Sequence, residues 1–154
     1  MISDCPTRNT LVSYYNIGMK MRYFNAYDID RIRGFLELAT VGGSQRYRYL
    51  VGLKQELEYS AILSPEEIPA DVVTMNSQVR IHDISNGSDV TITLVFPQEA
   101  DYEQKKVSLL APLGAALLGC YAGEEICYKA PGGSTKIIIK EIIYQPEAAK
   151  EYSL

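Results

Sequence analysis

The stretch DVVTMNS at residues 71–77, together with PLGAALLG at residues 112–119 and YQPEAA at residues 144–149, decides the fold class of this chain. None of the three stretches contains a recognisable catalytic nucleophile, a metal-ligand cluster or a phosphate-binding glycine loop. They therefore indicate shape and docking rather than bond chemistry. The first stretch also lies where the hydrophobic period of the chain changes from that of helices to that of strands.

Downstream of DVVTMNS, apolar and polar side chains alternate with the period of a half-buried strand, and Asn86-Gly87 supplies a hairpin turn. The predicted strands cover residues 79–82, 90–96, 105–110, 125–129 and 135–144, the last two being joined by a Pro-Gly-Gly turn. A short helix is predicted at Leu113–Leu118, and Gly119 is placed to end it. These signals predict a sheet that carries one small helix.

Upstream of DVVTMNS, the apolar residues follow the helical period in two stripes. The first stripe is Ile29, Ile32 and Leu36, and the second is Leu50, Leu53 and Leu57. Asn25 is placed to cap the first helix, which should end near Thr40, and Ser44 is placed to cap the second. With a turn at Val41-Gly42-Gly43, two helices of about 15 residues would form an antiparallel hairpin about 22 Å long at 1.5 Å per residue.

The predicted fold class is α+β, with an N-terminal antiparallel helical hairpin followed by an antiparallel sheet with one short helix. We expect three segments: a weakly structured lead at residues 1–23, with at most one strand near residues 11–15; the hairpin at residues 24–63; and the sheet module at residues 64–154. The last boundary follows from Ser64-Pro65-Glu66-Glu67, which reads as a capped turn before the strand period begins.

Composition narrows the class of protein. The chain has 154 residues, 47% of them hydrophobic, and contains neither a long apolar run nor a signal-peptide pattern, so we expect a cytoplasmic protein without a membrane partner. Its net charge of −4 is uneven: residues 20–63 carry seven bases and five acids, whereas residues 64–154 carry seven bases and thirteen acids. Such an acidic body argues against nonspecific duplex binding. Cys5, Cys120 and Cys127 match no redox or zinc spacing, and buried free thiols are expected.

Residues that could carry catalysis are few. His82 stands beside Asp83, but a triad would also need a serine or cysteine that the fold brings to it. The acid pairs Glu66/Glu67 and Glu124/Glu125 fall at turns, where solvated acids are common. We therefore predict no catalytic residue, no metal site and no cofactor. The alternation Arg46-Tyr47-Arg48-Tyr49 could touch RNA or a nucleotide, but an inward Tyr47 with solvated arginines is favoured.

A helical hairpin followed by SPEE at residues 64–67, then by DVVTMNS, an alternating sheet, PLGAALLG, a Gly-Gly turn and YQPEAA, resembles the GreA/GreB family of transcription elongation factors. The resemblance covers residues 24–154. It implies an FKBP-like body, a short coiled coil as the hairpin, and RNA polymerase core as the partner, bound near the entrance of the secondary channel. Contact with DNA or RNA would then occur only indirectly, through the transcription complex.

Two groups of residues are carried over from the family pattern. The expected polymerase-docking residues are Leu110, Ala111, Pro112, Leu113 and Gly114, and the expected hairpin-tip residues are Val41, Gly42, Gly43, Arg46 and Arg48. In the cleavage factors the docking loop carries an acid-serine-proline type of motif, of which this chain keeps only the proline. The interface is therefore expected to be more apolar and to form fewer hydrogen bonds.

In cleavage factors, acids at the tip of a longer hairpin help to hold a magnesium ion. Here residues 38–49 contain no Asp or Glu, and Arg46 and Arg48 would repel the cation. The resemblance therefore implies a non-enzymatic transcription regulator that binds RNA polymerase without stimulating transcript cleavage. Two alternatives stay open: a peptidyl-prolyl isomerase with an FKBP-like fold, whose proline pocket would have to be built from tyrosines, and a true cleavage factor.

Overall fold

The structure is a computed structural model that describes residues 21–43, 45–130 and 132–152. Its helices and strands run in the order β1 (Tyr23–Asn25), α2 (Ile29–Thr40), α3 (Leu50–Glu58), β2 (Ala61–Leu63), β3 (Gln78–Asp83), β4 (Ser88–Val95), β5 (Lys106–Ser108), α4 (Pro112–Leu117), β6 (Glu125–Ala130) and β7 (Gly133–Tyr144). The mixed α+β class is confirmed. The predicted strand near residues 11–15 lies outside the described residues. Ser44 also lies outside them, but the prediction that it caps the second helix was wrong, because α3 begins at Leu50 with Tyr49 as its N-cap residue.

The main sheet has five strands in the order β5-β4-β3-β7-β6, antiparallel except for the β4–β5 pair. Val79 lies opposite Ile92 on one side and Ile142 on the other, so the predicted alternation points one face of the sheet at the core. The Asn86-Gly87 turn is also present, although the β3–β4 connection extends over residues 84–87 rather than two residues. Gly87 has a φ of 73°, which explains a glycine at that position.

The hairpin begins later than predicted. Asn25 lies in β1, which pairs in parallel with β2, and α2 begins at Ile29 after an N-cap at Asp28. The side-chain oxygen of Asn25 accepts a hydrogen bond from the Tyr27 backbone at 2.8 Å, which forms an Asx turn rather than a helix cap. The predicted helix start was therefore wrong, because the chain first adds a strand beside β2. With 12 and 9 residues, both helices are also shorter than predicted.

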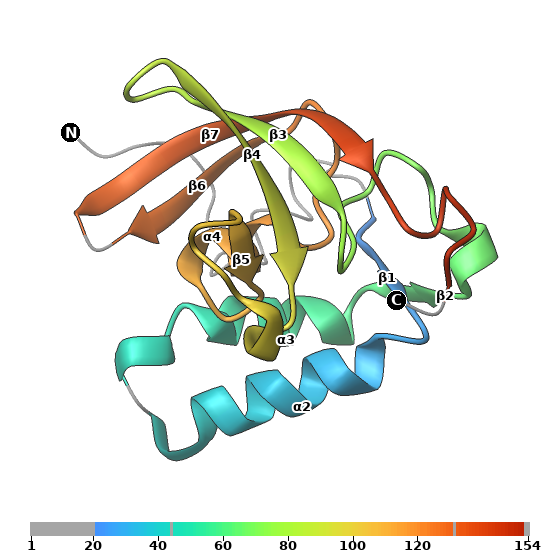
Figure 1. The fold of residues 1–154 in the computed structure, drawn as a ribbon. Helices are drawn as coiled ribbons and strands as arrows, with labels where there is room; N and C mark the ends of the chain where they lie inside the picture. Colours follow the sequence, from blue (N-terminus) through green and yellow to red (C-terminus); the bar gives the residue numbers. More distant parts are fainter. Residues whose placement is uncertain (1–20, 44, 131, 153–154) are drawn as a thin grey trace.

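The hairpin and the sheet module share one hydrophobic core. On the hairpin side the core contains Phe24, Ile29, Ile32, Leu36, Leu50, Leu53 and Leu57, which includes every residue of the two predicted stripes. In Figure 1 the curled sheet lies above α4, with α3 and then α2 below it. The Phe35 ring lies 5.8 Å from the Phe96 ring, and the guanidinium carbon of Arg31 lies 3.8 Å from the centre of the Phe96 ring. Helix α2 is therefore attached to the end of β4.

Buried polar side chains connect β1 with DVVTMNS and YQPEAA. One oxygen of the Glu147 carboxylate accepts a hydrogen bond from the Thr74 hydroxyl at 2.7 Å, and the other accepts one from the Asn25 amide at 2.6 Å. The Gln145 amide donates to the Val72 carbonyl at 2.7 Å. These three motif side chains and Asn25 are all more than nine-tenths buried. The motifs therefore hold distant parts of the chain together.

Arg22 forms a second buried polar connection. Its two terminal nitrogens donate to the two oxygens of Glu124, at 2.6 and 2.5 Å, and its Nε lies 3.4 Å from a carboxylate oxygen of Glu56 on α3. Arg22 is only 7% exposed. A buried guanidinium needs such partners because an uncompensated buried charge is strongly destabilising. The residue just before β1 is thus linked both to the hairpin and to the loop before β6.

The two cysteines Cys120 and Cys127 differ in their bonding. Cys120 is a buried free thiol as expected, whereas Cys127 is disulfide-bonded, so the expectation of a free thiol was wrong at that position. Among the helices of the described ranges, none is both long and apolar enough to cross a membrane.

The Glu147 connection predicts a large effect on stability. Glu147→Ala would remove the acceptor of the Asn25 amide and one of the two hydrogen-bond partners of the Thr74 hydroxyl, which also lies 2.9 Å from the Ser77 hydroxyl. We expect the free energy of unfolding, measured by urea denaturation, to fall by about 2–4 kcal/mol. The control is Glu141→Ala, which removes a half-exposed ion pair with Arg80 and should change stability by less than about 1 kcal/mol. Equal effects of the two substitutions would contradict a special role for Glu147.

Candidate functional site

The candidate docking loop is the segment Leu110–Gly114, which covers the end of the connection between β5 and α4 and the first three residues of α4. Ser108, the last residue of β5, accepts two hydrogen bonds from it: the Leu110 amide donates to the side-chain oxygen and the Ala111 amide to the carbonyl, each at 3.0 Å. Leu109 is fully buried, and its amide donates to the Val95 carbonyl at 2.8 Å. The loop is thus anchored at its start by both its backbone and a core side chain.

Pro112 and Gly114 fix the other end of the docking loop. Pro112 occupies the first position of α4, where its ring presets the helical φ and no backbone donor is lost. At Gly114 an added Cβ would lie 2.0 Å from the Ser108 carbonyl oxygen, so only glycine permits this close approach of helix and strand. The loop conformation is therefore set by the local sequence on both sides.

The exposed part of the docking loop is apolar. Leu110, Ala111, Pro112 and Leu113 are each half-buried, and Leu110 and Leu113 also pack against the core. None of these side chains carries a charge or a hydrogen-bonding group. A partner at this loop would gain mainly from apolar burial, because the side chains provide no polar contact.

The hairpin tip presents basic side chains. Gly42 and Gly43 have φ values of 83° and 68°, a left-handed conformation that favours glycine and turns the chain between the helices. Below the turn, Lys54 on α3 lies 3.0 Å from a Glu37 carboxylate oxygen on α2 and closes the hairpin. Val41, Arg46 and Arg48 are exposed, whereas Tyr47 is half-buried against the core, so the favoured interpretation of the Arg-Tyr alternation is confirmed.

The structure brings the hairpin tip and the docking loop together. The guanidinium carbon of Arg46 lies 5.2 Å from the Tyr47 ring centre, and the rings of Tyr47 and Tyr49 lie 6.5 Å apart. The Tyr49 hydroxyl then donates a hydrogen bond to the Leu110 carbonyl of the docking loop. Burial raises the pKa of Tyr49, so the hydroxyl remains a donor at neutral pH. Sequence reasoning missed this role of Tyr49, because a bond across 61 residues leaves no local pattern.

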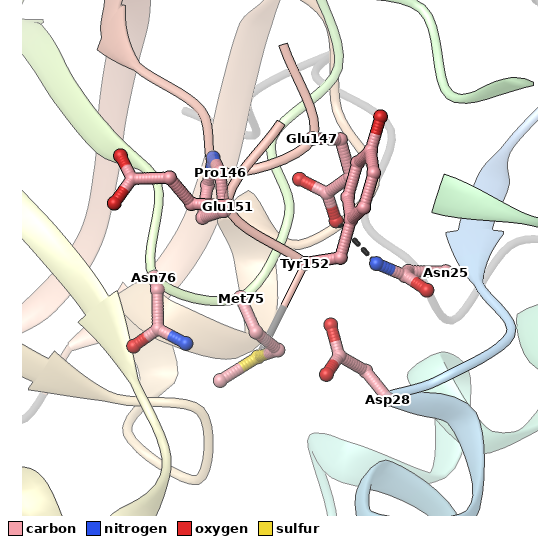
Figure 2. A pocket seen from close by; sticks show the side chains of 8 residues that line it. All are labelled: Asn25, Asp28, Met75, Asn76, Pro146, Glu147, Glu151 and Tyr152. Carbon is pink, nitrogen blue, oxygen red and sulfur yellow. Dashed lines mark hydrogen bonds between the residues drawn. The ribbon is translucent and has the colours of Figure 1, made fainter. Parts of the chain in front are cut away.

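A small polar pocket lies at the opposite end of the hairpin, where β1 meets the C-terminal segment (Figure 2). Its lining consists of Asn25, Asp28, Met75, Asn76, Pro146, Glu147, Glu151 and Tyr152. Figure 2 shows the side chains of Asp28 and Glu147 together in the lining of this pocket. Burial, and secondly the charge of Glu147, raise the pKa of Asp28 to about 6, while Arg31 acts in the opposite direction. This pocket is part of the connection between hairpin and body, and nothing in it indicates a ligand.

The remaining candidate groups for chemistry have structural roles. The His82 ring pairs with Asp89 at 2.5 Å, and Glu124 forms the buried ion pair with Arg22 rather than being the solvated turn acid that we expected. Glu67 accepts a hydrogen bond from the Ser64 hydroxyl at 2.7 Å in a capping box. In the part of the chain that the structure describes, no three His, Cys, Asp or Glu side chains are grouped to hold a metal ion.

Comparisons with known proteins agree on one family. The family profile described as "Transcription elongation factor, GreA/GreB, C-term" matches residues 68–144. A regulator of nucleoside diphosphate kinase from Escherichia coli strain K12 is 40% identical over 131 residues, which cover 84% of this chain and 94% of that protein. The transcription elongation factor GreA of Prosthecochloris aestuarii is 33% identical over 108 residues, which cover 69% of this chain and 68% of that protein. A solved structure of a prokaryotic transcription elongation factor GreA/GreB from Nitrosomonas europaea superposes with a TM-score of 0.67 at 36% identity, covering 81% of this chain and 99% of that one.

The raised pKa of Asp28 predicts a pH-dependent effect on stability. Because the pKa is about 6 in the folded protein against 3.8 ordinarily, the penalty for its charge is absent below pH 3.8, grows as the pH rises and is complete above pH 6. Asp28→Asn removes the charge and keeps a residue suited to an N-cap. With an allowance for the partial exposure of Asp28, we expect a stability gain relative to wild type that is about 1 kcal/mol larger at pH 7.5 than at pH 4.

Urea denaturation at both pH values measures this difference. Asp30→Asn, at an exposed position in the first turn of α2, is the matched control and should change stability by less than about 0.5 kcal/mol at either pH. A gain for Asp28→Asn that is the same at both pH values would contradict the assignment.

Proposed function

This chain belongs to the GreA/GreB family of transcription elongation factors, and from that premise we propose that it is a transcription regulator that binds RNA polymerase core without stimulating transcript cleavage. The family match and the similarity to a protein named a regulator support the general role. We propose the entrance of the secondary channel as the binding place, with Leu110–Gly114 as the loop that contacts polymerase. DNA and RNA would be contacted only through the transcription complex. We also propose that the protein acts in the cytoplasm.

The observation that carries the proposed binding role is the geometry of the docking loop. The loop is held by Ser108 on one side and by Gly114 on the other, and it presents half-buried apolar side chains to the outside. A loop with a fixed conformation loses little conformational entropy on binding. The apolar character of Leu110 and Ala111 supports an interface that depends on shape and burial rather than on hydrogen bonds.

The hairpin supports the absence of cleavage stimulation. Magnesium prefers carboxylate and water oxygens, but residues 38–49 contain no acid, while Arg46 and Arg48 are both exposed. At 1.5 Å per residue the 12 residues of α2 span about 18 Å, and the shared core holds the hairpin against the body. We propose that this arm, as a short coiled coil on an FKBP-like body, neither reaches the active centre of polymerase nor provides ligands there.

An isomerase activity has less support. A proline pocket needs free aromatic faces, and Phe96, the only phenylalanine in the sheet module, packs against Phe35 and Arg31 from the hairpin. The ring is also fully buried. We therefore retain the non-enzymatic regulator as the proposal.

The binding role is tested with core polymerase. We expect the wild-type protein to bind core enzyme and to be displaced by a GreA protein, because both would occupy the same place. Pro112→Asp keeps a residue that suits a helix start but puts an unpaired charge into the apolar contact, and it should weaken binding more than about tenfold. Ile84→Asp, an apolar-to-acid change in the β3–β4 connection, is the control and should leave the affinity within about twofold. Binding that is insensitive to Pro112→Asp would contradict the docking loop.

The cleavage statement has its own assay. Stalled elongation complexes incubated with this protein should keep full-length transcripts, whereas complexes with a GreA protein should shorten them. Shortening by this protein would show that its acid-free tip does not prevent cleavage. An assay of proline isomerisation on a model peptide separates the third possibility, and we expect no rate increase.

A further inference from the structure

The hairpin tip and the docking loop are joined by one continuous row of contacts. The row runs from Arg46 to Tyr47, from Tyr47 to Tyr49, and from the Tyr49 hydroxyl to the Leu110 carbonyl. We propose that tip and loop form a single composite docking surface for RNA polymerase, in which Tyr49 positions the loop. This inference rests on the proposed function and adds to it a second contact region and a positioning residue.

The two halves of the composite surface differ in chemistry. The loop half, Leu110–Leu113, is apolar, whereas the tip half carries the exposed Arg46 and Arg48. The chain as a whole has a net charge of −4, so a tip that contains bases and no acid stands out from the rest of the molecule. The composite surface therefore fits a polymerase surface with an apolar centre and carboxylates on the side that faces the tip.

Tyr49 lies where the two halves meet. It is the N-cap residue of α3, its ring is half-buried, and its hydroxyl bonds to the first residue of the docking loop. The neighbouring Leu110 and Ala111 amides are bound to Ser108, and the Tyr49 hydroxyl adds a side-chain hydrogen bond from the hairpin to the Leu110 carbonyl. Without this hydroxyl, we expect the loop to stay in place but to be held less firmly.

Tyr49→Phe tests the positioning role, and Tyr47→Phe is the matched control, because Tyr47 is a half-buried tyrosine of the same tip whose ring contacts do not involve its hydroxyl. In the free protein we expect Tyr49→Phe to speed hydrogen exchange of the Leu110 and Ala111 amides, with exchange of the β3 amides unchanged. Its affinity for core polymerase should fall between about twofold and tenfold, the range of one hydrogen bond, whereas Tyr47→Phe should stay within about twofold.

A double-mutant cycle tests whether tip and loop act together. If Tyr49 acts only by positioning the loop, Tyr49→Phe should weaken binding of the Pro112→Asp variant far less than it weakens binding of wild type.

Charge reversal tests the basic half of the surface. The double variant Arg46→Glu/Arg48→Glu should lose affinity for core polymerase, most strongly at low salt. The control is Lys129→Glu/Lys140→Glu, which makes the same change of charge at exposed positions on β6 and β7 and should not lose affinity in this way.

The outcomes separate this inference from the proposed function. Failure of wild-type protein to bind core polymerase would overturn both. Binding by wild type with equal affinities of Tyr49→Phe and Tyr47→Phe, or with fully additive effects in the cycle, would overturn the composite surface while the docking loop stands. Faster exchange at Leu110 and Ala111 in Tyr49→Phe, together with weaker and non-additive binding, is the result that supports it.

Discussion

The structure depends on one constraint, which is that the hairpin is too short to stand alone. Helices shorter than about 12–15 residues are marginal in water even with favourable sequences, and α2 and α3 have 12 and 9 residues. Their apolar stripes must therefore be buried against something larger, and the sheet module supplies that surface. The shared core that results fixes the hairpin beside β4, β5 and α4, so the position of the tip follows from the energetics of two short helices.

The polar connections at the other end of the hairpin follow from the same constraint. Once β1 and α3 are packed on the body, Arg22 and Asn25 become buried and need partners. Glu124 and Glu147 supply those partners from segments about a hundred residues further along the chain. Buried charge pairs of this kind add little net stability relative to apolar packing, but losing one member is strongly destabilising. These pairs therefore determine which arrangement of hairpin and body forms, and they contribute less to its stability.

The sequence predicted the elements well where periodicity or turn chemistry is local. The two helical stripes, the alternation along β3 and β4, and Gly119 at the end of α4 all depend on neighbouring residues. The start of α2 was wrong because Asn25 takes part in a strand pairing and in a bond to Glu147, both of which are long-range. The contact between Tyr49 and Leu110 was missed for the same reason. Tip and loop were each predicted from sequence, but their adjacency depends on how the hairpin packs, which no local pattern encodes.

That adjacency connects two differences from the pattern of cleavage factors. The docking loop has apolar residues where that pattern has an acid and a serine, and the tip has arginines where that pattern has acids. On a long projecting arm these positions would be far apart and could vary independently. Here Tyr49, close to the tip, is linked to the loop by the hydrogen bond of its hydroxyl to the Leu110 carbonyl. Under the proposed function, an apolar loop and a tip with bases and no acid both fit contact with a partner better than chemistry at the tip.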